Sequence, residues 1–145
     1  MRDWLANGWL IEHQTSAEEI EALLAVADRD LRDCQVAGLS SDWRLNIAYN
    51  AALQAATAAL GAAGYRAARE SHHFRVLQSL AHTTGADPGL VAQLDKFRKK
   101  RNIGGYERVG TISDHEAEEM SLLAGTLRRE VEQWIRTNRP ELLGA

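Results

Sequence analysis

An alanine-rich segment from Asp42 to Gly64 constrains the fold of this chain more than any other feature. Nine of its residues are alanine. Its larger apolar side chains recur, with two of the alanines, on one side of a helix: Leu45, Tyr49, Ala52, Leu53, Ala56 and Leu60. Alanine has the highest helix propensity, and its small side chain lets a second helix approach toward the short end of the ~8–10 Å range of axis separations. We therefore predict a helix that begins near Asp42, ends at about Gly61 or Gly64, and packs closely against a neighbour.

Composition extends this expectation to the whole chain. Alanine and leucine together account for 41 residues, whereas valine, isoleucine and the aromatic residues account for 21, and two residues are proline. This balance favours helices over sheets. A hydrophobic fraction of 45% with 26% charged residues excludes wholesale disorder. The 145 residues fit one domain, with 1–14 as an N-terminal packing segment, 15–138 as the bundle and 139–145 as a tail.

Caps and apolar periodicity predict four further helices, and no strand competes with them. Their expected limits are Ser16 to Gly38, about Ser71 to the loop at Thr83, Asp87 to Gly104, and Ser113 to about Asn138. Ser16 and Ser113 each begin a capping box, and Asp87 before a proline is a favoured helix start. We predict an all-α, compact antiparallel bundle of about five helices, over which Trp4 and Trp9 pack.

The chain has one cysteine, Cys34, which cannot form an intrachain disulfide or share a thiolate metal site. It lies on the apolar side of its helix, so we interpret it as a core residue, and we expect no metal and no cofactor. The most apolar stretch, Ile47 to Ala63, is interrupted by polar residues and falls short of the ~20 apolar residues that a membrane span needs. Without a targeting segment at the N-terminus, these features predict a cytoplasmic protein with no membrane partner.

The net charge of −3 conceals an uneven distribution. Residues 1–64 hold four Lys or Arg against nine Asp or Glu, residues 65–108 hold nine against four, and residues 109–145 hold four against seven. The middle segment is therefore basic, and Lys96 to Arg101 places five cations in six residues. This segment is the strongest candidate for contact with an anion.

Arg101 lies in an unusual position within this basic segment. The apolar residues of its predicted helix recur at steps of four and three, at Leu90, Leu94 and Phe97. A further step of four reaches Arg101, which at ~100° per residue lies within ~20° of the direction of Leu90. Arg101 must therefore reach water, meet a carboxylate, contact a phosphate with Arg98 and Lys100 beside it, or lie at an interface.

The order and spacing of these segments resemble the HEPN superfamily, the higher eukaryotes and prokaryotes nucleotide-binding domains. The resemblance rests on KFRKKRNIGGYE, which follows SDWRLNIAYNAALQAATAALGAAGYR and precedes a long closing helix, and it covers about Ser16 to Trp134. It implies a helical bundle that commonly forms homodimers, with the end of the arginine-bearing helix facing its symmetry mate across a cleft. It also implies a setting in toxin–antitoxin or phage-defence systems, where some relatives pair with a small nucleotidyltransferase.

Active members of this family cleave RNA without metal through an Arg, usually followed by a polar residue, and a His after four to six intervening residues. Here Arg101 and Asn102 match the first two positions, and Tyr106 stands where the short spacing would place the His. A tyrosine pKa near ~10, against ~6.5 for histidine, makes Tyr106 a poorer base at pH 7 by about 3.5 units, or roughly 5 kcal/mol. It can still hydrogen-bond a phosphate or stack on a base, so the chemistry favours binding over cleavage.

A second basic stretch, RESHHFR, lies near the start of the helix predicted from about Ser71. Its two histidines are adjacent, and adjacent helical residues diverge by ~100°, so they do not converge on one metal ion. They are either surface residues at a helix start or part of an anion-binding patch. The candidate nucleic-acid-binding residues from both stretches are Arg69, His72, His73, Arg75, Lys96, Arg98, Lys100 and Arg101.

Three functions remain open from the sequence. The first is a dimeric RNA- or nucleotide-binding module with a degenerate ribonuclease site. The second is an active metal-independent endoribonuclease, such as a toxin, that uses Arg101 with Tyr106 or a neighbouring histidine. The third is a protein-interaction subunit that pairs with a small nucleotidyltransferase. The basic middle segment and the missing histidine favour the first.

Overall fold

The computed structural model describes residues 2–68, 72–104 and 112–144, and for residues 72 and 101–104 it describes the backbone alone. These ranges form six α-helices, two short strands and a 3-10 helix. The elements, in chain order, are α1 (Arg2–Ala6), β1 (Leu10–Glu12), α2 (Ala17–Asp33), α3 (Ser41–Ala62), β2 (Tyr65–Ala67), α4 (His72–Ser79), α5 (Pro88–Gly104), α6 (Asp114–Asn138) and η1 (Pro140–Leu143). The predicted mostly helical bundle is confirmed.

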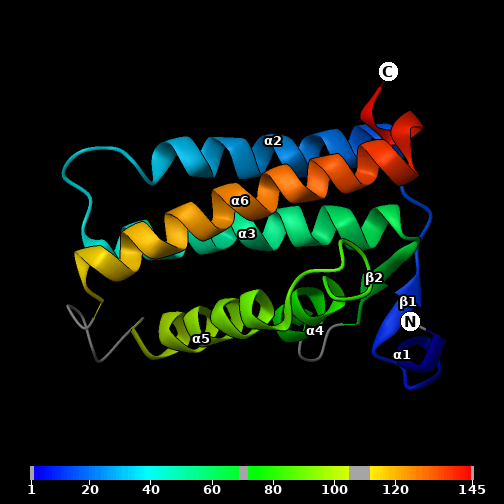
Figure 1. The fold of residues 1–145 in the computed structure, drawn as a ribbon, viewed down its shortest axis with the longest axis horizontal. Coiled ribbons are helices and arrows are strands. Elements are labelled where there is room, and N and C mark those ends of the chain that lie inside the picture. The colour runs from blue at the N-terminus through cyan, green and yellow to red at the C-terminus, as the bar shows by residue number, and fades with distance from the viewer. Residues whose placement is uncertain (1, 69–71, 105–111, 145) are drawn as a thin grey trace.

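The helices form two groups around α3. Helices α2, α3 and α6 lie side by side along the long axis, and α4 and α5 pack on the other side of α3 (Figure 1). Helix α1 and the two strands lie at one end of this arrangement, the same end at which α6 finishes and η1 follows (Figure 1). Helix α3 therefore contacts every other long helix of the bundle.

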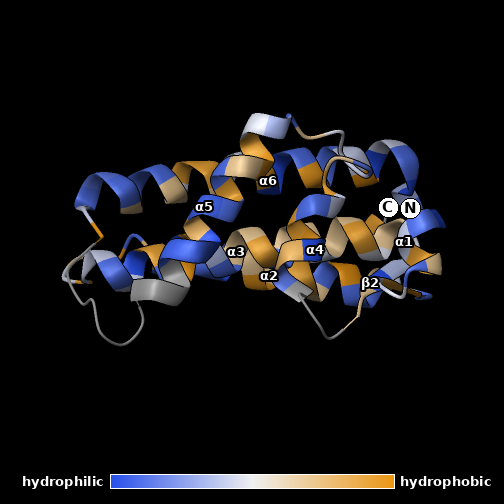
Figure 2. Ribbon diagram, turned by 90° about the horizontal axis from the view of Figure 1, so that it is seen from below, coloured by the Kyte–Doolittle hydropathy of each residue, from blue (hydrophilic) through white to orange (hydrophobic). Residues whose placement is uncertain are grey.

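The alanine content of α3 explains its central place. Its buried residues cover most of the helix circumference and include eight alanines: Ala48, Ala51, Ala52, Ala55, Ala56, Ala58, Ala59 and Ala62. A stripe that includes Asn50, Gln54 and Thr57 is only partly buried. A helix with so wide an apolar surface is stable only when that surface is covered, and Figure 2 shows α3 as a largely hydrophobic helix. Small side chains over most of its surface allow several helices to pack against it at once.

Local side-chain caps fix where the helices begin. The hydroxyl of Ser16 accepts a hydrogen bond from the backbone of Glu19, and Ser113 forms a complete capping box with Glu116. The Asp87 carboxylate accepts from the backbone N–H of Gly89, one residue after Pro88. These three predicted helix starts are confirmed. Helix α3 begins slightly earlier than predicted, because Ser40 rather than Asp42 is its N-cap.

Two strands form that the sequence did not predict. Strand β1 pairs antiparallel with β2, with Leu10 opposite Ala67 and Glu12 opposite Tyr65. Each strand has three residues, too few for an alternating apolar pattern to stand out. Only Leu10 and Ala67 of the six are buried, so this small sheet closes one end of the helical core.

Both ends of the described chain pack against the bundle. The ring of Trp4 meets the ring of His82 edge to face, with centroids 5.0 Å apart, so the predicted packing of the N-terminal segment is confirmed. Within the expected tail, η1 buries Leu142, and Arg139 donates a hydrogen bond of 2.7 Å to the carbonyl of Ala62 at the end of α3. Cys34 is buried beside Ser121, as its position on an apolar helix face predicts.

Across the described ranges, no helix has the length and apolar character needed to cross a membrane.

Candidate nucleic-acid interface

Helices α4 and α5 bring the two predicted basic stretches together. Phe74 of α4 lies beside two arginines: the guanidinium carbons of Arg75 and Arg98 are each 5.3 Å from the centroid of its ring. Arg75 belongs to the stretch RESHHFR, and Arg98 belongs to the stretch from Lys96 to Arg101. The described parts of the two stretches, which twenty residues separate in the chain, therefore lie side by side.

Arg75 extends this arrangement to the N-terminal segment. Its guanidinium carbon lies 3.6 Å from the centroid of the Trp9 ring, and its Nη1 donates a hydrogen bond of 3.0 Å to the side-chain oxygen of Gln78. A cation over an aromatic face contributes roughly 0.5–2 kcal/mol, depending on desolvation. We call Trp9, Arg75, Phe74 and Arg98 the cation–aromatic ladder. All four side chains are partly exposed.

Carboxylates neutralise part of the charge on α5. The Nε of Arg98 donates to Oδ1 of Asp95 at 2.7 Å, Lys99 lies 3.4 Å from Oδ2 of the same residue, and Lys100 pairs with Glu116 of α6. The exposed side chain of Lys96 takes part in none of the ion pairs found in the described ranges. Among the described side chains of α5, four cations thus face two carboxylates, so an excess of positive charge remains.

Asp95 stays ionised in this setting. Its partial burial alone would raise the pKa of the carboxyl, but the hydrogen bonds and positive charges of Arg98 and Lys99 outweigh burial and hold the pKa below its ordinary value. Asp95 therefore fixes the two cations in place and remains an acceptor for any further donor.

The predicted site residues are described to different extents. His73, Arg75, Lys96, Arg98 and Lys100 lie on the surface of α4 and α5. Arg101 and Asn102 lie in the last turn of α5, His72 lies at the start of α4, and the side chains of all three are outside the described residues. Tyr106 and Arg69 also lie outside the described residues.

The structure contains the apolar stripe of α5 from which the direction of Arg101 was predicted. Leu94 and Phe97 are fully buried, Leu90 is partly buried, and the α5 backbone stays helical through Gly104. The helical geometry on which the Arg101 prediction rests is therefore in place.

A polar row on α3 escaped the sequence prediction. Asp42, Asn46 and Tyr49 recur at steps of four and three and share one face of the helix. The Tyr49 hydroxyl is 3.4 Å from Nδ1 of His73, so this face meets the start of α4. Tyr49 is 1% exposed, in agreement with the packing role predicted for it. The hydrogen bond gives His73 a fixed partner at the edge of the interface.

The side chain of Asn46, in the middle of this row, has an unusual environment. Its side-chain oxygen is buried and has no hydrogen-bond partner within the described ranges. A buried, unpaired amide oxygen is costly and is rare in folded proteins. The sequence pattern that could have predicted this row is the spacing of its polar residues by four and three in a helix otherwise rich in alanine.

A cavity of about 400 Å³ opens beside the ladder, between α1, α4 and α5. It is lined by Trp4, Phe74, Leu77, Gln78, Ala81, His82, Pro88, Val91, Ala92 and Asp95. Phe74 and Asp95 belong both to this cavity and to the basic surface. The interface therefore combines exposed cations with an adjoining recess that has mostly apolar walls.

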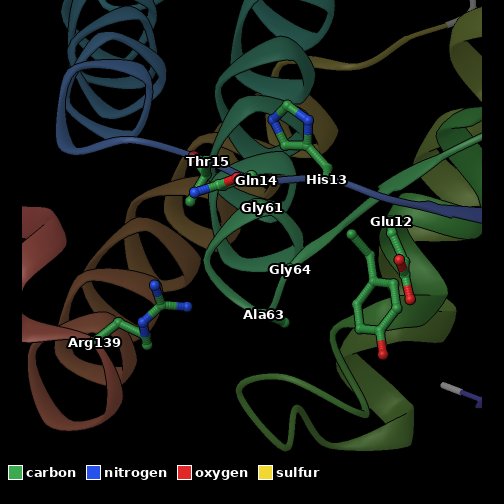
Figure 3. Close-up of a pocket in the computed structure, with 9 residues that line it drawn as sticks. Glu12, His13, Gln14, Thr15, Gly61, Ala63, Gly64 and Arg139 are labelled. Carbon is green, nitrogen blue, oxygen red and sulfur yellow. The ribbon is translucent and has the colours of Figure 1, made fainter.

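A larger hollow of about 570 Å³ lies at the C-terminal end of α3, around Gly61 and Gly64 (Figure 3). Two of its ionisable side chains already have structural partners: His13 is 2.7 Å from Glu19, and Arg139 binds the α3 carbonyl of Ala62. Figure 3 shows the His13 ring and the Arg139 guanidinium apart rather than converging. We therefore rank this hollow below the α4–α5 surface as a functional site.

The described residues contain no group of three or more His, Cys, Asp or Glu side chains arranged to hold a metal ion.

No protein-family model and no curated protein matches this chain.

Proposed function

We propose that this protein is a HEPN-like RNA- or nucleotide-binding module that acts without cleavage, and that the α4–α5 surface is its nucleic-acid interface. The observation that carries the proposal is the contact of both Arg75 and Arg98 with the ring of Phe74. An aromatic ring flanked by cations, next to an exposed lysine, suits an unpaired base and its phosphates.

The two parts of this surface have different tasks in the proposal. Lys96 and the basic end of α5 attract the phosphate backbone, a contact that depends on charge and not on sequence. Phe74 and the arginines above it supply flat faces on which bases stack, at roughly 1–3 kcal/mol per base. Single-stranded RNA offers both groups together, whereas the bases of a duplex are covered by their neighbours.

Arg101 and Tyr106 enter the proposal through the family resemblance. Arg101, one turn beyond the buried Phe97, contacts a phosphate, and Tyr106 hydrogen-bonds or stacks where active relatives have a histidine. Arginine does not act as a base at ordinary pH, so these residues bind RNA and do not cut it. In the proposed homodimer the ends of two α5 helices share one cleft, and the proposed setting is a toxin–antitoxin or phage-defence system.

RNA binding is tested by fluorescence anisotropy with a labelled ten-residue uridine oligonucleotide over a salt series. We expect affinity to fall steeply with salt, and the Lys96→Gln variant to lower the logarithmic slope by about 0.7, the value for one lost phosphate contact on a single strand. Arg136→Gln removes a cation from α6, far along the chain from the interface, and serves as the matched control with unchanged slope. Absence of salt-dependent binding by the wild-type protein would refute the proposal.

Cleavage is tested in the same samples. Incubation with RNA in the presence of a chelator should leave the RNA intact for the wild-type protein and for the Arg101→Ala and Tyr106→Phe variants. Cleavage by the wild type that Arg101→Ala abolishes would instead establish the metal-independent ribonuclease.

A further inference from the structure

The cavity between α1, α4 and α5 has the size and lining of a small-molecule site. Its volume of about 400 Å³ lies within the range of about 300–1,000 Å³ that is typical of ligand pockets. Two aromatic residues, Trp4 and Phe74, line it together with the aliphatic side chains of Leu77 and Val91. Such walls favour a flat, largely apolar group over an extended polar one.

Few polar side chains line the cavity, and Asp95 is the one that carries a firm negative charge. One of its oxygens accepts from Arg98 at 2.7 Å and the other lies 3.4 Å from Lys99. A carboxylate offers about four acceptor positions, so each oxygen of Asp95 retains capacity for one more donor. A ligand that presents N–H groups to this end of the cavity therefore meets a ready partner.

The cations beside the cavity define the rest of the ligand. The guanidinium of Arg98 lies over the Phe74 ring that lines the cavity, and Arg75 lies over the same ring and within 5.9 Å of the Trp4 centroid. An anionic group attached to the flat part of a ligand would meet these guanidinium groups as the flat part enters. A flat ring with N–H donors and an attached phosphate is the chemistry of a nucleotide.

We infer that this cavity binds one unpaired nucleobase, whose phosphate lies toward Arg98, and that it prefers guanine. Guanine presents two adjacent donors, N1–H and N2–H, to the two oxygens of Asp95. Uracil presents one N–H between two carbonyl oxygens, which a carboxylate repels. The inference rests on the proposed nucleic-acid function and adds a base preference to it.

Binding of a single guanine is tested with two ten-residue RNA probes, one all uridine and one with a central guanosine in place of uridine. We expect the wild-type protein to bind the guanosine probe about tenfold more tightly, as a good bidentate base contact provides. Guanosine monophosphate and uridine monophosphate are then used as competitors. If guanosine monophosphate displaces the guanosine probe and uridine monophosphate does not, the cavity binds a free guanine nucleotide. If neither nucleotide displaces the probe but the probe is still preferred, the cavity binds guanine only within an RNA strand.

Variants that fill the cavity separate this inference from the proposed function. Ala92 and Ala81 are exposed residues on its wall, so Ala92→Trp and Ala81→Leu should fold and abolish the guanine preference while salt-dependent binding persists. Ala25→Trp places the same side chain on an exposed position of α2 away from the cavity and should keep the preference. Asp95→Asn should reduce the preference for the guanosine probe, because the amide replaces one carboxylate oxygen with a donor.

Each outcome is decisive. Equal binding of the two probes by the wild type, or a guanine preference that survives both cavity-filling variants, overturns the base pocket and leaves the phosphate interface standing. If the wild-type protein binds neither probe in a salt-dependent manner, the proposed function itself is refuted.

Discussion

The two sides of α3 share one hydrophobic core but differ in the contacts made outside it. Toward α2 and α6, α3 presents small alanines that are fully buried, and the contact depends on close packing. On the other side, α4 and α5 meet each other and the N-terminal segment through cations, aromatic rings and carboxylates, such as Arg75 on Trp9. The first side is built for stability. The second keeps polar groups partly exposed and arranged, which is what a binding surface requires.

The largest expected effect tests the apolar side. Leu60 of α3 is 1% exposed, so Leu60→Ala should lower the free energy of unfolding by about 2–5 kcal/mol through lost burial and a cavity. The control is Leu122→Ala on α6, where the side chain is 65% exposed and the expected loss is below about 0.5 kcal/mol. Urea denaturation measures both. Equal losses would show that the α3 contact is less tightly packed than described.

A smaller effect tests the cation–aromatic ladder. Trp9→Leu and Arg75→Gln each remove one partner, and a double-mutant cycle isolates their mutual contribution to unfolding free energy. We expect a coupling of about 0.5–1 kcal/mol, the value for a partly exposed cation over an aromatic face. A coupling of zero would mean that the 3.6 Å stacking of Arg75 on Trp9 adds nothing to stability.

The smallest expected effect is the pH-dependent contribution of the Asp95 ion pairs to the free energy of unfolding. Because the folded protein holds the pKa of Asp95 below the ordinary aspartate value of 3.8, the unfolded chain binds the proton more readily. The stabilisation is therefore present above pH 4 and is lost as pH falls through the lowered folded pKa. Because Asp95 and its cations lie near the surface, we expect about 0.5 kcal/mol.

Denaturation of the wild type and of Asp95→Asn at pH 7 and at pH 3 measures this contribution. The difference in unfolding free energy between the two proteins should be larger at pH 7. A difference that grows on acidification would contradict the direction of the pKa shift.

The sequence determined the parts of this protein that local interactions decide. Alanine content and the spacing of Leu45, Tyr49 and Leu60 predicted α3 close to its observed limits. The side-chain caps at Ser16 and Ser113 act over three residues, so they could be recognised without knowing the fold. The burial of Cys34 followed from its place on an apolar helix face.

Only the tertiary structure decided which of these faces meet. Trp9 and Arg75 are far apart in the chain, as are Tyr49 and His73, and nothing local specifies either pair. The same holds for the short strands, each of which exists only because the other lies beside it. Helix periodicity fixes the direction of a side chain relative to its own axis. Its partner depends on how the helices pack, and that packing brought Arg98 of α5 to the ring of Phe74 on α4.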